Sequence, residues 1–277
     1  MQPLIDTHLH LWDPAQVPWT RGSPTFNKVY GAAQFTVASE DCKVQGAVFV
    51  QCDATDAVAE VAWVAKQATV DARIAGIVAH APLEQGVAVR ARLAELAKHP
   101  LVRGIRRNLQ GEPSNFCARA EFIAGVQALA EFNLSFDLCL RRAQLPEVIM
   151  LVKACPQVRF MLDHLGNPPI ADRTLDGWAA PFAELSKLPN VFCKLSGMVT
   201  VAAPAWTIED LAPYVEHALK TFTPTRLVWG SDWPIVLKAS DYRHWVDATR
   251  TLLALLPADD QRRILHDNAV TFYRLKL

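Results

Sequence analysis

Two histidines separated by one residue, His8 and His10, stand at the end of the first strand-like run of the chain. Side chains alternate along a β-strand, so both imidazoles project on the same side and can converge on one ion or one carbonyl oxygen. The last strand-like run is followed by a lone carboxylate, Asp232. The alternative interpretations are a pair of satisfied core histidines and, for Asp232, a helix cap.

The other strand-like runs also end in polar residues. These residues are Gln51, His80, Arg106, Arg107, Asn108, Asp137, Asp163, His164, Lys194 and Ser196. Clustered buried polar groups need partners to offset their desolvation, and a purely structural protein has no reason to collect them at one end of its strands. The pattern indicates a functional site in which His164 supplies a third imidazole.

Three imidazoles and a carboxylate support hydrolysis by two routes. His8, His10, His164 and Asp232 suit one divalent cation such as zinc, which lowers the pKa of a bound water and polarises a carbonyl. Without a metal, the histidines hydrogen-bond the substrate carbonyl and stabilise the oxyanion, while Asp232 takes the proton from an attacking water. The residues alone leave both routes open.

Eight strand-like runs must position these side chains, and most of them are separated by segments with helical periodicity. The runs are 3–8, 44–52, 73–79, 102–107, 134–140, 157–163, 191–196 and 226–231. Alternating strands and helices predict parallel strands with right-handed crossovers, and eight of them close into a (β/α)8 TIM barrel. An open doubly wound sheet is the alternative. In barrel enzymes the catalytic residues stand at the C-terminal ends of the strands.

The whole chain, 1–277, is expected to be one domain, because no repeat or linker divides it. Thr207 to Asp210 has the form of a capping box, and Ser240 precedes an amphipathic run through Leu256. Segment 11–43 lacks periodicity and is rich in Trp and Pro. We expect it to be a long loop over the active site, either a lid or a structural excursion.

Composition excludes several classes of protein. The 28 Lys and Arg balance the 28 Asp and Glu, with no basic stripe, so nucleic acid is not expected as a partner and a small molecule of modest charge is. The six cysteines show no C-x-x-C spacing and are expected to be buried thiols. There is no signal-like start and no apolar run of membrane-spanning length, so we expect no membrane partner and a cytoplasmic location.

Several motifs occur in order along nearly the whole chain. They are Ile5-Asp6-Thr7-His8-Leu9-His10-Leu11-Trp12, Val102-Arg103-Gly104-Ile105-Arg106, Leu162-Asp163-His164-Leu165-Gly166, Lys194-Leu195-Ser196-Gly197, Gly230-Ser231-Asp232-Trp233-Pro234 and the tail from Asn268 to Leu275. In these motifs the chain resembles the amidohydrolase superfamily, in its branch of sugar-lactone and pyrone-lactone hydrolases. The resemblance implies that His8, His10 and His164 bind a metal or polarise a lactone carbonyl, and that Asp232 activates water. Its best single substrate is expected to be L-fuconolactone.

Two departures from the superfamily pattern limit the metal content. The fifth run, 134–140, has no histidine, and the fourth ends Arg106-Arg107-Asn108 without a lysine that could bridge two metals. The resemblance therefore implies one zinc or none. Rhamnono-, galactono- or muconolactones are alternative substrates, and a zinc-dependent decarboxylase of the same superfamily and an inert sugar-binding barrel are alternative functions.

Six residues are predicted to bind the substrate: Arg106, Gln51, His80, Lys194, Trp233 and Trp12. A guanidinium such as that of Arg106 can hold a lactone oxygen or the product carboxylate, with a salt bridge at the rim as the alternative. Lys194 is expected to contact substrate, to support Asp232, or to form a structural ion pair. The amide of Gln51 suits sugar hydroxyls, and the indoles of Trp12, Trp19 and Trp233 suit ring faces unless they are packing. His80 is placed at the pocket wall by its position after the third run.

Overall fold

The computed structural model describes residues 2–277 and contains a ring of eight parallel strands. The strands are β1 Leu4–Leu9, β2 Val44–Val50, β3 Ile74–Ala79, β4 Val102–Arg106, β5 Ser135–Leu138, β6 Phe160–Leu162, β7 Val191–Leu195 and β8 Leu227–Trp229. Each strand pairs with the next one in the sequence. The ends of β1 and β8 meet where His8 O accepts a hydrogen bond from Asp232 N at 2.9 Å and Trp233 O accepts one from His10 N at 2.7 Å. The predicted single-domain (β/α)8 TIM barrel is confirmed.

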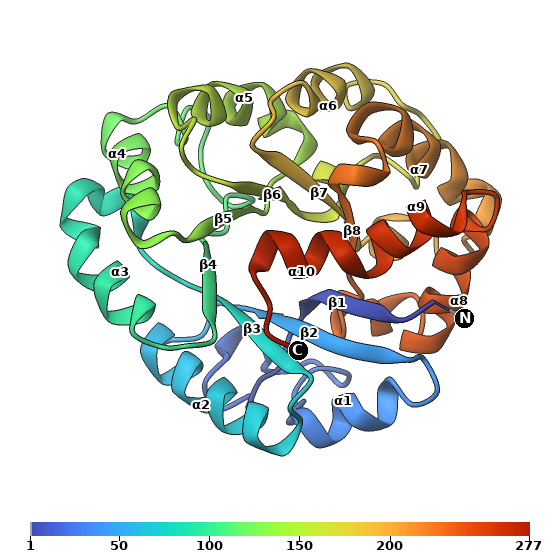
Figure 1. Cartoon of the computed structure of the whole chain (residues 1–277), viewed down its shortest axis with the longest axis horizontal. Coiled ribbons are helices and arrows are strands. Elements are labelled where there is room, and N and C mark those ends of the chain that lie inside the picture. The colour runs from blue at the N-terminus through green and yellow to red at the C-terminus, as the bar shows by residue number, and fades with distance from the viewer. Residues whose placement is uncertain (1) are drawn as a thin grey trace.

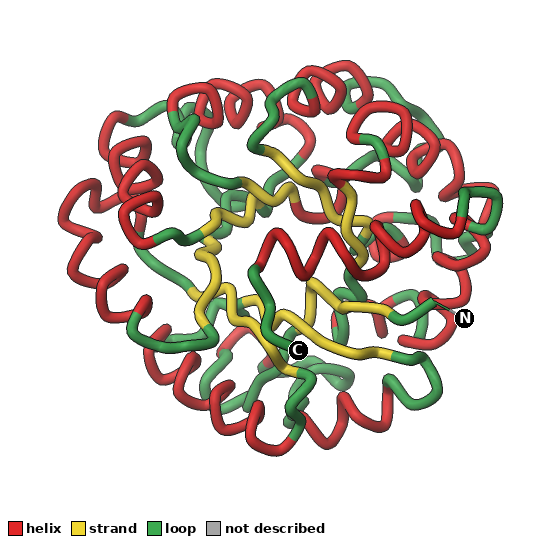
Figure 2. The backbone as a smooth tube through the Cα atoms, viewed as in Figure 1, coloured by secondary structure: helices red, strands yellow, loops and turns green. Residues whose placement is uncertain are grey.

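Helices follow each strand and surround the ring, as Figures 1 and 2 show. They are α1 Ala32–Ala38, α2 Ala57–Val70, α3 Arg90–Ala97, α4 Ala120–Ala128, α5 Leu145–Ala154, α6 Ala179–Ser186, α7 Ile208–Phe222 and α8 Tyr242–Leu253. Apolar side chains of the helices pack on the outer faces of the strands in one large buried cluster. The strands are buried on both faces, which explains why their sequences are apolar runs rather than alternating ones.

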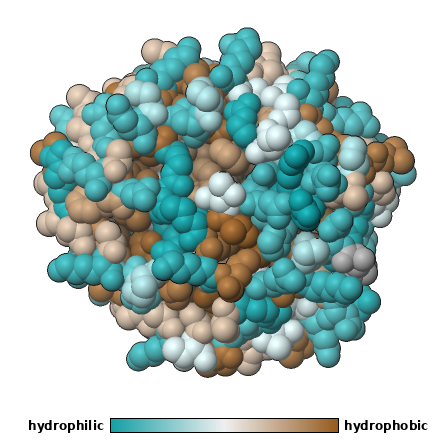
Figure 3. All heavy atoms as spheres, viewed as in Figure 1, coloured by the Kyte–Doolittle hydropathy of each residue, from teal (hydrophilic) through white to brown (hydrophobic). Residues whose placement is uncertain are grey.

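The N-terminal end of the barrel is closed by the end of the chain. Helix α9 (Ala258–Arg262), a π-helical turn (Arg263–Asp267) and α10 (Asn268–Tyr273) run across it, and α10 crosses the ring of strands in Figure 1. Phe272 and Tyr273 pack against barrel residues such as Val48 and Met161. Figure 3 shows hydrophilic side chains spread over this view, with hydrophobic atoms in small groups among them. The C-terminal end of the barrel is left to carry a site.

Several boundaries differ from the prediction. Strands β5, β6 and β8 are shorter than the runs 134–140, 157–163 and 226–231, because the apolar residues beside them continue into buried turns such as Cys139 and Leu140. The carboxylate of Asp241, not Ser240, caps α8 by accepting a hydrogen bond from His244 N at 2.7 Å, and that helix ends at Leu253 rather than Leu256. The capping box of α7 is present in part, because Asp210 Oδ2 accepts a hydrogen bond from Thr207 N at 3.0 Å.

Segment 11–43 contains more regular structure than the sequence indicated. A 3-10 turn, Pro18–Thr20, and helix α1 lie within it. Helix α1 escaped prediction because only Ala32 and Phe35 of its residues are buried, too few to give a periodic apolar pattern. Of the aromatic residues in segment 11–43, Trp12 and Tyr30 are buried, whereas Trp19 is half-exposed.

Two predictions from composition can be compared with the structure. All six cysteines are free and buried, as expected for reduced thiols. Among the described residues, no helix has the length and apolarity that crossing a membrane requires.

Candidate active site

A cavity of about 340 Å³ opens among the residues that follow the strands at the C-terminal end of the barrel. Its wall includes His10 after β1, Arg106 at the end of β4, His164 after β6 and Asp232 after β8, together with Asp53 and Lys238. The volume lies in the ordinary range of small-molecule sites. The structure therefore brings together side chains that are up to about two hundred residues apart in the chain, at the barrel end where catalysis was expected.

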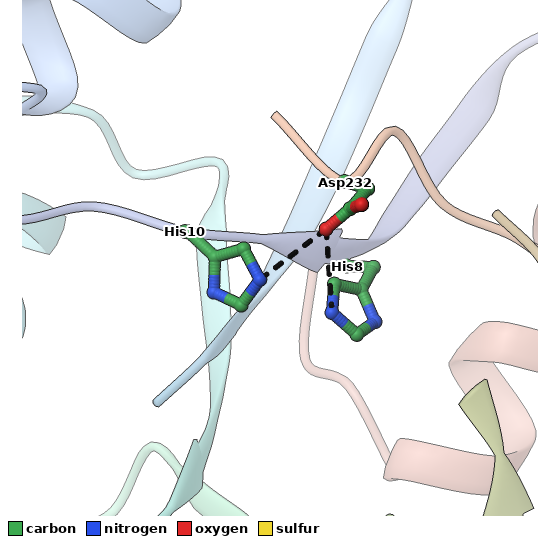
Figure 4. Close-up of side chains that lie close together, drawn as sticks. All are labelled: His8, His10 and Asp232. Carbon is green, nitrogen blue, oxygen red and sulfur yellow. Dashed lines mark ion pairs between the residues drawn. The ribbon is translucent and has the colours of Figure 1, made fainter. Parts of the chain in front are cut away.

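The side chains of His8, His10 and Asp232 converge (Figure 4), and those of His10 and Asp232 line the cavity. The Oδ1 atom of Asp232 lies 3.4 Å from His10 Nε2 and 3.8 Å from His8 Nε2. His10 donates its Nδ1 proton to Val50 O at 2.8 Å, which leaves an unshared pair on Nε2. An ionised carboxylate oxygen repels this unshared pair unless a proton or a cation lies between the two atoms. His10 and Asp232 are therefore arranged to hold a proton or a cation.

The three groups fit a divalent cation by geometry and by chemistry. Their ligand atoms all lie within 4.8 Å of one another. Two ligands of a tetrahedral zinc ion, each about 2.1 Å from it, lie roughly 3.4 Å apart, close to the His10–Asp232 separation. Arg106 Nη1 lies 3.5 Å from His8 Nε2 and competes with an ion for that nitrogen. The donor set thus accommodates one metal and also works as a hydrogen-bonding group without it.

His164 lies outside this group of three ligand atoms. Its ring lies 4.4 Å from the His8 ring, centroid to centroid, and its Nδ1 is 2.9 Å from Ser196 Oγ. It lines the cavity and faces substrate space. β6 ends at Leu162, and His164 lies in the left-handed turn that follows it.

That turn is a run of left-handed residues at His164, Leu165, Gly166 and Asn167, with φ of +52°, +52°, +69° and +59°. Left-handed backbone costs non-glycine residues roughly 1–2 kcal/mol each, so neighbours must hold it. Asn167 N donates to His164 O at 2.8 Å, and the indole of Trp178 donates to Leu165 O at 2.7 Å. Strain of this kind is concentrated at functional sites.

Two glycines of the motifs allow close approach at the site. A Cβ at Gly230 would lie 2.7 Å from the Cβ of His8, and one at Gly197 would lie 2.5 Å from Nδ1 of His164. Gly197 also has a φ of +63°. Any side chain at either position would displace an imidazole.

Electrostatics keep the carboxylate ionised. Burial raises the pKa of Asp232, but the neighbouring imidazoles of His164, His10 and His8 outweigh it and hold the pKa well below its usual value. Burial and the ammonium of Lys194 lower the pKa of His8, and burial lowers the pKa of His164. An ionised carboxylate beside imidazole nitrogens can either accept a proton or bind a cation.

Beneath His8 lies a network of charged side chains with no exposed surface. Lys194 Nζ is 2.7 Å from Asp137 Oδ2, 3.0 Å from Asp163 Oδ1 and 3.3 Å from His8 Nδ1. Tyr273 of α10 donates a hydrogen bond to Asp137 Oδ2 at 2.8 Å. Of the roles expected for Lys194, the structure shows the ion pair, and it places the ammonium behind His8 rather than at the cavity wall.

The charges of this network shift one another. Burial lowers the pKa of Lys194, but Asp137 and Asp163 raise the pKa by more than burial lowers it, so the ammonium stays protonated. Burial raises the pKa of Asp163, and Lys194 and His8 bring it well below its usual value. Burial raises the pKa of Asp137 to about 6. Asp163 Oδ1, 3.4 Å from His8 Nδ1, is placed to orient that imidazole.

Arg106 is the predicted substrate-binding residue that reaches the cavity most directly. Its Nη2 donates a hydrogen bond to Gln51 O, and its Nη1 lies 3.9 Å from Asp163 Oδ2. Burial lowers its pKa, but neighbouring Cys139 and Asp163 raise it above the usual value, so the guanidinium is charged. Nη1 is also near His8, and Arg106 thus joins the cavity to the network below.

The other predicted substrate-binding residues do not line the cavity. Gln51 is fully buried and forms two hydrogen bonds with Asp53. Its Nε2 donates to Asp53 Oδ1 at 3.1 Å, and its Oε1 accepts from Asp53 N at 2.6 Å. Trp12 and Trp233 are buried packing residues, as their alternative interpretation held. His80 lines a separate hollow with Arg92. Among the tryptophans, Trp19 is the one at the cavity wall.

Sequence reasoning missed several residues that the structure places at the site. Asp53 lies three residues past the end of β2, and reading further beyond each strand would have found it. Lys238 and Cys139 also line the cavity. Lys238 follows Asp232 by six residues, at the end of a short 3-10 helix (Ile235–Lys238), and Tyr273 reaches the network beneath His8 from the opposite end of the barrel. No sequence pattern signals either position.

Comparison with known proteins agrees with the geometry. Residues 5–275 match the family described as Amidohydrolase. An L-fucono-1,5-lactonase of Burkholderia ambifaria is 30% identical over 279 residues, which cover 98% of this chain and 95% of the relative. Another, from Burkholderia multivorans, is 32% identical over 253 residues, covering 86% of this chain and 84% of the relative. The crystal structure of an amidohydrolase from Burkholderia multivorans with bound zinc has a TM-score of 0.90 at 29% identity, covering 99% of this chain and 100% of that one. The chain therefore belongs to the amidohydrolase family.

Proposed function

We propose that the protein is a lactonase that opens the ring ester of a sugar aldonolactone, with L-fucono-1,5-lactone as the substrate to test first. The observation that carries the proposal is the carboxylate of Asp232, which faces two imidazole nitrogens at the base of an open cavity. This arrangement occurs in a chain that is similar over 98% of its length to an L-fucono-1,5-lactonase. Rhamnono-, galactono- and muconolactones are the alternative substrates.

The chemistry needs a proton acceptor and a positive environment for an oxyanion. Asp232 accepts the proton of a water molecule whose oxygen attacks the lactone carbonyl carbon. The imidazole of His164 and the guanidinium of Arg106 line the same cavity and are proposed to stabilise the oxyanion, and His10 would join them with a proton on Nε2. The bond from the acyl carbon to the ring oxygen then breaks, and the ring oxygen takes up the proton from Asp232.

His8, His10 and Asp232 are the residues that would hold a single metal ion. When bound, such an ion would supply carbonyl polarisation and a more acidic water. The oxygen Oδ2 of Asp232 makes neither of the two imidazole contacts and stays available for the proton. In both routes Asp232 takes the proton, so the dependence on metal is a separate question from the role of Asp232.

Arg106 is proposed to hold the lactone ring oxygen or the product carboxylate, and Trp19 to cover one face of the sugar. A small sugar lactone is the proposed partner. Six buried thiols match the chemistry of a reducing compartment, and a cytoplasmic location remains part of the proposal.

A pH-indicator assay of the purified protein with L-fucono-1,5-lactone tests the proposal. Wild type should release acid above the buffer blank, and Asp232→Asn should release little, because the amide cannot take the proton. Asp259→Asn, at an exposed position on α9, is the matched control and should behave as wild type.

Prolonged chelation, followed by added zinc, decides between the two routes. Loss of activity that zinc restores would place a metal in the reaction, and unchanged activity would favour the histidines alone. No acid release from L-fucono-1,5-lactone or from the alternative lactones would overturn the lactonase proposal. Full activity of Asp232→Asn would overturn the mechanism.

A further inference from the structure

A second hollow adjoins the catalytic cavity. It has a volume of about 620 Å³, larger than the cavity of about 340 Å³. Gln110, Asn167 and Val201 line both spaces, so the two hollows meet at these residues. A substrate that places its lactone ring beside Asp232 can therefore extend past Asn167 into the second hollow.

The wall of this hollow carries two adjacent arginines, Arg141 and Arg142. Both are exposed, and among the described residues Arg141 forms no ion pair. Arg142 Nη2 lies 3.8 Å from Asp172 Oδ2, and both side chains are about half-exposed, so solvent screens this contact strongly. The hollow thus holds two guanidinium groups against one carboxylate, in a chain whose net charge is zero.

The backbone that carries the arginines is held in place. Gln144 Oε1 accepts a hydrogen bond from Arg141 N at 2.8 Å, while its Nε2 donates to Leu109 O at 2.8 Å. Across the hollow, Asn167 Nδ2 donates to Leu140 O at 2.5 Å. The backbone at Arg141 is thus held in place, and both arginines line the hollow next to the catalytic cavity.

The catalytic cavity itself shows no such excess of charge. Arg106 and Lys238 on its wall are matched by Asp53 and Asp232. A negatively charged group binds more favourably in the adjoining hollow, where a planar guanidinium can bind a carboxylate through two parallel hydrogen bonds. The two spaces differ in the charge that they favour.

We infer that the hollow lined by Arg141 and Arg142 is a substrate subsite for a carboxylate carried by the part of the substrate remote from the lactone ring. The inference rests on the proposed lactonase function and adds acidic sugar lactones to its substrates. The lactone ring reacts in the catalytic cavity, and the carboxylate binds the arginines and lowers KM. A neutral lactone reacts without using the second hollow.

The test compares two substrates and two double variants. The substrates are neutral L-fucono-1,5-lactone and D-glucaro-1,4-lactone, which bears a carboxylate. Arg141→Ala/Arg142→Ala removes both guanidinium groups. Arg262→Ala/Arg263→Ala, an adjacent half-exposed pair on and beside α9 at the other end of the barrel, is the matched control.

The first double variant should reduce kcat/KM for the acidic lactone by about 10- to 100-fold, mainly through KM, since hydrogen bonds to charged groups contribute roughly 1.5–3 kcal/mol. It should change kcat/KM for the neutral lactone by less than about twofold, and the control should match wild type on both. Equal losses on both substrates, or no loss on either, would overturn the subsite.

A binding measurement separates this inference from the lactonase proposal. Calorimetric titration with glutarate, a dicarboxylate without a lactone, should show binding to wild type and to the control, weakened about 10-fold or more in Arg141→Ala/Arg142→Ala. If neither lactone is hydrolysed but this difference holds, the subsite stands and the proposed function fails. If the neutral lactone is hydrolysed and glutarate binds all three proteins equally or none, the subsite fails alone.

Discussion

His8 lies between two sets of charged groups, an outer set on the cavity side and an inner set behind the imidazole. The two sets have similar residue types and different surroundings. On the cavity side, Asp232 faces imidazole nitrogens and open space. On the inner side, Asp163 and Asp137 share the ammonium of Lys194, and all three side chains have no exposed surface. A charged group whose partners are other fixed groups stabilises the fold, whereas one that faces a cavity is available to a substrate or an ion.

His8 belongs to both sets, and this makes the comparison useful. Its Nε2 faces Asp232, and its Nδ1 faces Asp163 and Lys194. The inner set thereby positions an imidazole that the outer set uses. If this division is correct, substitutions on the outer side should affect reaction more than stability, and substitutions on the inner side should first affect stability.

The largest effect on reaction is expected from Asp232→Asn. A positioned general base contributes about 10²- to 10⁴-fold, so kcat on L-fucono-1,5-lactone should fall about 1000-fold. The free energy of unfolding, from urea denaturation, should fall by less than the roughly 3–5 kcal/mol expected for breaking a buried ion pair, because the amide keeps the shape of the side chain and, among the described residues, Asp232 makes no ion pair with Lys or Arg. A variant that loses stability and activity together would place Asp232 in the structural set.

The largest effect on stability is expected from Lys194→Met. The change leaves Asp137 and Asp163 buried without their cation, and breaking a buried pair in this way costs roughly 3–5 kcal/mol. Urea denaturation measures the loss, and Lys187→Met, an exposed lysine paired with Glu184 on α6, is the control expected to lose less than about 1 kcal/mol. A loss as small as that of the control would contradict the structural role of the network.

Glu60 offers a third kind of environment, a buried carboxyl group with no Lys or Arg ion-pair partner among the described residues. Burial raises its pKa to about 7, although Cys52 N donates a hydrogen bond to Oε1 at 2.8 Å. Because the folded pKa lies above the unfolded one, folding favours the protonated form. The contribution of Glu60 to the free energy of unfolding should therefore be highest below about pH 4.5, fall as pH rises to about 7, and level off above that.

Glu60→Gln tests this dependence, because the amide does not titrate and can still accept from Cys52 N. The decline of the free energy of unfolding between pH 4.5 and 7 should shrink by about 3 kcal/mol, the free-energy equivalent of raising a pKa from 4.5 to about 7. Glu216→Gln, a substitution at an exposed position of α7, should keep the decline. An unchanged decline in Glu60→Gln would mean that other groups cause it.

The same division of surroundings explains how far the sequence could predict the site. The barrel, its strand order and the convergence of His8, His10 and Asp232 follow from period-two spacing and from the rule that parallel strands end at one edge. The roles of Lys194 and Gln51 do not follow from these rules. The position of a residue at the end of a strand places it at one edge of the barrel but does not determine where its side chain points. Lys194 points behind His8, and Gln51 holds Asp53. Only contacts between distant strands settle such directions.

Tyr273 illustrates the limit most clearly, because it belongs to the C-terminal helix that closes the opposite end of the barrel. Its hydroxyl donates a hydrogen bond to Asp137, and the ammonium of Lys194 lies 5.6 Å from the centroid of its ring. Tyr273→Phe should lower the free energy of unfolding by about 1.5–3 kcal/mol, the contribution of a hydrogen bond to a charged group, and leave KM unchanged. Tyr30→Phe, which loses a hydrogen bond to the neutral Thr25 O, is the control and should lose about 1 kcal/mol. A large fall in kcat without a fall in stability would mean that the inner set does more than hold His8, and would move Tyr273 from the structural to the reactive side of the comparison.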